Sequence, residues 1–134
     1  MKYYLDTNIC IYFLKGEYPN ILKKLSSTNP NDIKIPAIVK AELLYGALKS
    51  KQKKNNLARI DAFLRPFELE EFDNQSAEVY GHIRYSLEKK GTPIGPNDLL
   101  IASIVQANEG VLVTNNESEF KRVTGLKIEN WTSE

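Results

Sequence analysis

Short apolar runs alternate with longer stretches of helical periodicity along this chain. The clearest runs, which are rich in apolar residues and predict strands, lie at residues 2–5, 33–35 and 111–113, with weaker ones at 67–69 and 126–128. The intervening stretches predict helices over residues 8–14, 21–27, 36–50, 52–64, 75–90 and from 96 onward, with a helical turn at 116–119. Strands that alternate with helices predict an α/β fold with a mainly parallel sheet and right-handed crossovers.

The spacing of apolar residues predicts which helix faces are buried. The segment from Leu99 to Val105 is apolar almost all round, which is typical of a central, buried helix. In the helix over 36–50 we expect one buried stripe, formed by Ile38, Ala41, Tyr45 and Leu48. On a helical wheel Glu42 lies about 80° from the middle of that stripe, at its border.

Two further helices have predicted inward faces. In the helix over 21–27 we expect inward side chains at Ile21, Leu22 and Leu25. Asn74 is the expected N-cap of the helix over 75–90, and Gly91 is expected to close it. The inward residues of that helix are expected to be Ala77, Tyr80, Ile83 and Leu87.

The length and composition are those of one folded domain. The chain has 134 residues, of which 42% are hydrophobic and 26% charged, and we expect a single domain over residues 1–134. No apolar run approaches membrane-spanning length, and the first apolar stretch lacks the flanks of a secretory signal. We therefore expect a cytoplasmic protein with no membrane partner.

The residue types available restrict the chemistry. One cysteine, Cys10, and one histidine, His82, cannot build a structural zinc site, and a mechanism that needs two imidazoles in one chain is excluded. Cys10 lies between two isoleucines and is expected in the core. His82 is assigned no role, so any chemistry must depend on carboxylates.

The formal net charge is only +1, but the charges are unevenly distributed. Between residues 45 and 60 all charged residues are basic, and between residues 66 and 78 all are acidic. The basic cluster could be an ordinary solvated helix face, or it could contact a nucleic acid or a protein partner. Its members are Lys49, Lys51, Lys53, Lys54 and Arg59.

Four acidic or amide positions lie just after strands or within the first two turns of helices. They are Asp6, Glu42, Asp98 and the pair Asn116 and Glu119, which would share one side of a helical turn. Each has an ordinary explanation: Asp6 could cap the next helix, Asp98 could interact with a helix dipole, and Glu42 could be a surface residue.

A parallel sheet would instead bring these side chains together at the carboxyl ends of its strands. Such a cluster destabilises itself unless a cation neutralises it. Oxygen ligands favour Mg²⁺ or Mn²⁺ over zinc, and such an ion can promote hydrolysis of a phosphodiester bond. No Gly-rich phosphate loop with a following lysine is present, so P-loop nucleotide hydrolysis is not supported.

Four short motifs in order resemble the PIN-domain ribonucleases of the VapC toxin type. They are Leu5-Asp6-Thr7-Asn8, the run from Ala41 to Gly46, the run from Pro93 to Asp98, and Val113 to Asn116 followed by Glu119-Phe120. The resemblance covers the whole chain and implies a PIN-like three-layer α/β/α sandwich and Mg²⁺-dependent RNA cleavage. It also implies a homodimer and a VapB antitoxin whose tail blocks the active site. By the same resemblance, Asp6, Glu42 and Asp98 are the metal-binding acids.

The fourth site position departs from the commonest pattern of the family. Many PIN domains have an aspartate where this chain has Asn116, so Asn116 could bind metal through its carbonyl or orient a water, and Glu119 could supply the charge. The Asn-Asn version resembles a branch that cuts initiator tRNA in the anticodon region, which favours tRNA as substrate. Asn8 and the basic cluster are candidate substrate contacts. The alternatives are a catalytically weak module that binds RNA or a partner, and a nuclease that acts on DNA.

Overall fold

The computed structural model describes residues 1–133, and Glu134, the last residue of the expected domain, lies outside the described residues. Its centre is a sheet of five parallel strands in the order β3-β2-β1-β4-β5. The strands are β1 (Tyr3–Leu5), β2 (Ile33–Pro36), β3 (Glu68–Glu70), β4 (Val111–Val113) and β5 (Lys127–Glu129). All five predicted strands are present; β4 has the predicted bounds, and the other four differ from their predictions by one residue because strand ends are weakly specified.

Seven α-helices connect the strands in residues 1–133. They are α1 (Thr7–Leu14), α2 (Pro19–Ser27), α3 (Ala37–Leu48), α4 (Lys53–Leu64), α5 (Asn74–Lys89), α6 (Pro96–Ala107) and α7 (Glu117–Phe120), with a short 3-10 turn, η1 (Pro30–Asp32). No helix in these residues has the length and apolar character needed to span a bilayer.

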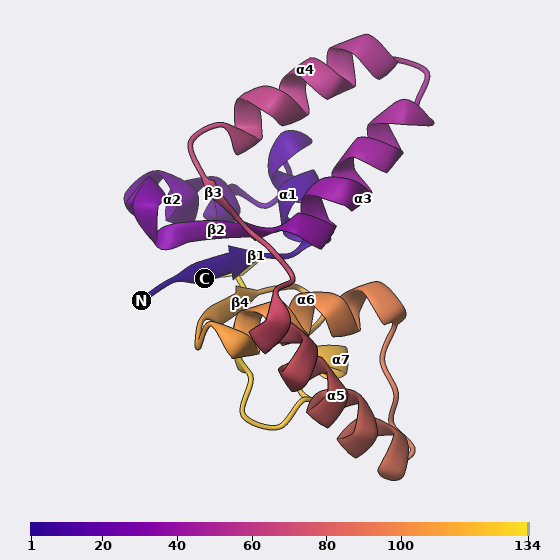
Figure 1. Ribbon diagram of the computed structural model, residues 1–134. Coiled ribbons are helices and arrows are strands. Elements are labelled where there is room, and N and C mark those ends of the chain that lie inside the picture. The colour runs from indigo at the N-terminus through magenta and orange to yellow at the C-terminus, as the bar shows by residue number, and fades with distance from the viewer. Residues whose placement is uncertain (134) are drawn as a thin grey trace.

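The strand order explains how the helices form two outer layers. The chain moves outward from β1 to β2 to β3, then returns across the sheet to β4 and β5. Right-handed crossovers in opposite directions place their helices on opposite faces of a sheet. Figure 1 accordingly shows α1 to α4 gathered at one end of the view and α5 to α7 at the other, with the strands between them. The expected α/β/α architecture is therefore confirmed.

The core is apolar on both faces of the sheet. Leu5, Ile35 and Leu112 on the central strands have no exposed surface. α6 is buried along most of its length, as its apolar sequence predicts, and Cys10 lies in the core as expected. Trp131 is 2% exposed and packs on Tyr3 with ring centroids 5.5 Å apart, which fixes the C-terminal segment against β1.

The predicted buried face of α3 is wrong. The buried residues are Val39, Leu43 and Ala47, whereas Tyr45 and Leu48 are 65% and 53% exposed. The helix is apolar on both sides, so periodicity alone selected the wrong stripe, and packing against α1 and α4 determines which one is buried.

Two predictions elsewhere also need correction. Leu22 of α2 is 57% exposed, and only Ile21 is fully buried there. The N-cap of α5 is Asp73, one residue before the expected Asn74, because the Asp73 carboxylate accepts the Ser76 N–H at 2.9 Å. On α5, Ser76 is buried while Ala77 is exposed, so the inward face starts one residue earlier than expected.

Candidate active site

Asp6 lies between β1 and α1 and has two structural roles. Its carboxylate accepts the Ile9 N–H at 2.9 Å, so it is the N-cap of α1, and its own N–H donates to Val113 O of β4 at 3.1 Å. The residue is only 5% exposed. Burial raises the pKa of Asp6 to about 6, helped by the charge of Glu42 and opposed by hydrogen bonds from Thr114 and Ile9. The cap explanation is therefore correct but incomplete, because it leaves a buried charge without a counterion.

Asp98 is the third residue of α6 and is partly buried beside the same strand ends. Burial raises its pKa to about 7, and a hydrogen bond with Glu119 and the negative charges of Glu119, Asp6 and Glu42 add to that rise. Asp98 therefore keeps its proton to a higher pH than an isolated carboxyl, as a carboxyl close to other carboxylates does when no cation separates them.

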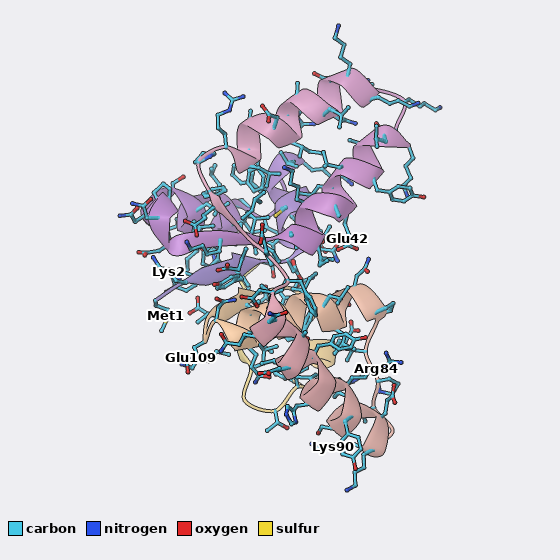
Figure 2. The ribbon with its side chains drawn as sticks, viewed as in Figure 1. Met1, Lys2, Glu42, Arg84, Lys90 and Glu109 are labelled. Carbon is cyan, nitrogen blue, oxygen red and sulfur yellow. The ribbon has the colours of Figure 1, made fainter. Side chains whose placement is uncertain are left out.

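Glu42 projects from α3 toward the same place. Figure 2 shows it on the side of α3 that faces α6, and it is the sixth of the twelve residues of that helix. Its Oε1 accepts a hydrogen bond from Thr7 Oγ1 at 2.5 Å, and its Oε2 accepts one from Asn97 Nδ2 at 3.2 Å. Side chains of α1, α3 and α6 therefore meet at Glu42.

Asn116 and Glu119 complete the cluster from the carboxyl end of β4. The Asn116 N–H donates to Thr114 Oγ1 at 2.9 Å, and its side-chain amide donates to Glu119 Oε2. Glu119 Oε1 accepts the Gly95 N–H at 2.8 Å, which links α7 to the start of α6. The structure thus brings together all five predicted catalytic candidates.

The candidate substrate contacts are more dispersed. Lys49, Lys51, Lys53 and Lys54 lie at the turn between α3 and α4, more than one helical turn beyond Glu42 along α3. Arg59 lies closer, because it donates to Leu14 O and lines a hollow that also includes Glu42. Asn8 is exposed in the first turn of α1, beside Thr7.

Three polar residues that are not among the site candidates predicted from the sequence bond directly to the cluster, namely Thr7, Asn97 and Thr114. Each is a polar residue next to a predicted acid or at the end of a site strand, and Thr7 and Asn97 immediately adjoin Asp6 and Asp98. Adjacency to a predicted ligand is a weak signal. Only the fold shows that Thr7 and Asn97 contact Glu42 rather than the neighbouring acid.

The donor chemistry of the cluster fits a divalent cation. None of the ion pairs within residues 1–133 involves Asp6, Glu42, Asp98 or Glu119, and the pKa of Asp6 and of Asp98 is raised. As placed, no three His, Cys, Asp or Glu side chains of the described residues surround a common point as metal ligands. The oxygens of Glu42 and Glu119 instead accept hydrogen bonds from Thr7, Asn97, Gly95 and Asn116.

The fold and the acidic site define a class of nuclease. A model of the PIN domain matches residues 3–126, a range that contains all five catalytic candidates. The chain therefore belongs to the PIN-domain family, whose nucleases depend on divalent metal ions.

Relatives that match along the whole length are more specific. The chain is 47% identical to Ribonuclease VapC2 of Rickettsia felis and 40% identical to the tRNA(fMet)-specific endonuclease VapC of Salmonella typhimurium, each match covering 98% of both proteins. A crystal structure of VapBC2 from Rickettsia felis bound to a DNA fragment from its promoter superposes with a TM-score of 0.92 at 45% identity. That match covers 98% of this chain and 99% of the other. The family resemblance to the VapC ribonucleases is thus confirmed.

Proposed function

We propose that this protein is the toxin of a toxin–antitoxin pair, a metal-dependent endoribonuclease that hydrolyses phosphodiester bonds in tRNA. The observation that carries the proposal is the meeting of Asp6, Glu42, Asp98 and Glu119 at the carboxyl ends of β1 and β4 without a basic side chain to pair with them. Initiator tRNA is the favoured substrate, because the Salmonella relative is named a tRNA(fMet)-specific endonuclease. The anticodon region is the cleavage site that the resemblance of the Asn115-Asn116 motif favours.

The site residues have different roles in the proposed cleavage reaction. Asp6 and Asp98 would hold the divalent cation, which supplies positive charge against the attacking and leaving oxygens when bound. Glu42 approaches from α3 as the third acid. Glu119 accepts a hydrogen bond from Asn116 and lies against Asp98, so it would supply the negative charge that Asn116 lacks. Asn116 holds the Glu119 carboxylate in place.

We infer that Mg²⁺ is the natural cation and that Mn²⁺ can replace it. All the side chains that project into the cluster offer oxygen or amide groups, and the nearest sulfur, at Cys10, is fully buried and inert. Hard oxygen ligands select Mg²⁺ or Mn²⁺ rather than zinc.

A VapB-type antitoxin is the proposed inhibitor. The solved relative from Rickettsia felis is a VapBC complex. In this chain Glu42 lines a hollow between α1, α3 and α4, together with Leu43, Ile60 and Arg59. A partner segment lying in that hollow would reach the acids and block them. The basic turn between α3 and α4 could contact either the antitoxin or RNA.

Homodimerisation is the proposed state of the free toxin. The outer side of α3 exposes Tyr45 and Leu48, two large apolar side chains that lie three residues apart and so on one side of the helix. A second copy that covers this face would remove both from water.

We expect the free toxin to act in the cytoplasm, where tRNA is available.

The experiment that tests the function uses purified, antitoxin-free protein and total cellular RNA, with Mg²⁺ or EDTA, followed by sequencing of the fragment ends. Discrete cuts in tRNA that need the metal and disappear in Asp98→Asn are the expected result. A DNA oligonucleotide of the same sequence distinguishes RNA cleavage from DNA cleavage. Intact RNA with every metal would favour a module that binds RNA or a partner without cutting.

A further inference from the structure

Both oxygens of the Glu42 carboxylate are held by uncharged donors from two other helices. Thr7 Oγ1, at the first residue of α1, donates to Oε1 at 2.5 Å, and Asn97 Nδ2, at the second residue of α6, donates to Oε2 at 3.2 Å. The donors are 35 and 55 residues from Glu42 in the sequence. Glu42 itself lies at the border of the buried face of α3, where a glutamate side chain would otherwise be free to turn.

We propose that Thr7 and Asn97 are positioning residues that aim the Glu42 carboxylate at the divalent cation. The inference rests on the proposed function, because it needs a cation between Asp6 and Asp98. A carboxylate has about four lone-pair sites, so two hydrogen bonds leave the others open. Because both donors are neutral, neither brings a positive charge that would compete with the cation for Glu42.

The two bonds differ in exposure, and this predicts different effects. The Thr7 bond is partly buried, whereas Asn97 is exposed and its amide competes with water for Glu42. Hydrogen bonds that orient a metal ligand commonly contribute about 10–100-fold to metal affinity. The loss of the Thr7 hydroxyl should therefore weaken metal binding more than the loss of the Asn97 amide.

A purely structural role would give a different result. If the bonds only joined α1, α3 and α6, their removal would lower stability without changing metal affinity. The distinguishing measurement is therefore metal affinity in variants whose unfolding is measured separately.

The experiment measures Mn²⁺ affinity by isothermal titration calorimetry on full-length, antitoxin-free protein, with urea unfolding in EDTA as the stability measurement. The variants are Thr7→Val, which replaces the hydroxyl by a methyl group, Thr7→Ser, which keeps the hydroxyl, and Asn97→Ala. Asn74→Ala is the matched control, since Asn74 is likewise an exposed asparagine in the first turn of a helix, α5. RNA cleavage is followed across a range of Mn²⁺ concentrations.

We expect Thr7→Val to weaken Mn²⁺ binding by about ten-fold or more and Asn97→Ala by a smaller factor. Thr7→Ser and Asn74→Ala should bind as the native protein does. The Mn²⁺ concentration for half-maximal cleavage should rise in parallel, while the rate at saturating Mn²⁺ changes less than about three-fold.

Unchanged Mn²⁺ affinity in both Thr7→Val and Asn97→Ala would overturn the proposal while leaving the nuclease intact. A native protein that binds no Mn²⁺ would overturn it too. Conversely, Mn²⁺ affinity that follows the expected pattern in a protein that cuts no RNA would support the positioning role and reject the nuclease.

Discussion

At the scale of the residue, Asp6 combines a stabilising contact with a destabilising charge. The carboxylate caps α1 through the Ile9 N–H, yet it is almost fully buried and no side chain of opposite charge pairs with it in residues 1–133. Its folded pKa of about 6 lies above the ordinary value of 3.8. Folding favours the protonated form of this carboxyl. Its contribution to the free energy of unfolding is therefore fully present below about pH 4 and is lost as the pH rises through 6 and the buried group ionises.

This conflict predicts the behaviour of Asp6→Asn. Asparagine caps a helix about as well as aspartate but carries no charge. In EDTA at pH 8 the variant should be more stable than the native protein by up to about 3 kcal/mol, the equivalent of the pKa shift. At pH 4 the two should be equally stable, and the variant should not cut RNA. Urea unfolding at both pH values measures the difference, and a variant less stable than the native protein at pH 8 would contradict the expectation.

At the scale of the element, the turn between α6 and β4 depends on a glycine. A Cβ added at Gly110 would overlap the buried ring of Tyr4 and approach Lys2 O at 3.3 Å. This close approach lets β4 pair with β1, since the neighbouring Val111 N–H donates to Lys2 O at 2.9 Å. The pairing in turn places Thr114 next to Asp6.

Gly110→Ala should therefore lower the free energy of unfolding by about 1–3 kcal/mol, the usual cost of overpacking. Gly81→Ala is the matched control, because a Cβ at Gly81 in the middle of α5 meets nothing within 4 Å. That change should raise stability by about 0.5–1 kcal/mol. Chemical denaturation of both variants in EDTA makes the comparison, and equal stability of the two would refute the close-packing argument.

The C-terminal segment is a second element that holds the site. Trp131 is buried on Tyr3, and Asn130 donates to Asn115 Oδ1 at 3.2 Å and to Glu117 Oε2 at 3.0 Å. The Asn130 side chain thus holds the residues before and after Asn116 in the sequence.

Trp131→Ala should cost about 3–5 kcal/mol, as the loss of a large buried side chain does. Tyr85→Ala, at an aromatic residue that is 69% exposed, should change stability by less than about 0.5 kcal/mol. Thermal unfolding of the two variants measures the contrast. If Trp131→Ala unfolded like the native protein, the tail would have no anchoring role.

At the scale of the whole molecule, opposite charges are separated. The acids meet at the carboxyl ends of β1 and β4, whereas the lysines of the basic cluster lie at the far end of the α3–α4 hairpin. Figure 1 shows this hairpin projecting away from the sheet. The phosphate backbone of a bound RNA would contact these lysines far from the bond that is cleaved. Their loss should therefore lower RNA affinity more than the rate of cleavage.

Replacing Lys51, Lys53 and Lys54 together by glutamine tests that separation. Each contact to single-stranded RNA contributes about 0.7 to the slope of log affinity against log salt, so the slope should decrease by about 2. RNA binding is measured in an Asp98→Asn background, which prevents cleavage. The rate of cleavage at saturating RNA is measured in protein that keeps Asp98. An unchanged slope would assign the hairpin tip to a protein partner or to solvent.

The sequence by itself determined the order of the elements and the positions of the acids along them. Alternating apolar runs predict parallel strands, and the carboxyl ends of parallel strands lie at one edge of the sheet, so Asp6 and the end of β4 were expected at the same edge. The buried character of α6 was equally local, because a helix that is apolar all round has no exposed alternative.

Only the tertiary structure decided which of two apolar helix faces is buried and which partner a polar side chain bonds. α3 carries apolar residues on two sides, and only its packing against neighbouring helices determines that Val39 and Leu43 are buried and Tyr45 is exposed. Asn97 adjoins Asp98 in the sequence yet bonds to Glu42, 55 residues away. Such contacts depend on strand order and helix placement, which arise from long-range packing and leave no periodic signal in the chain.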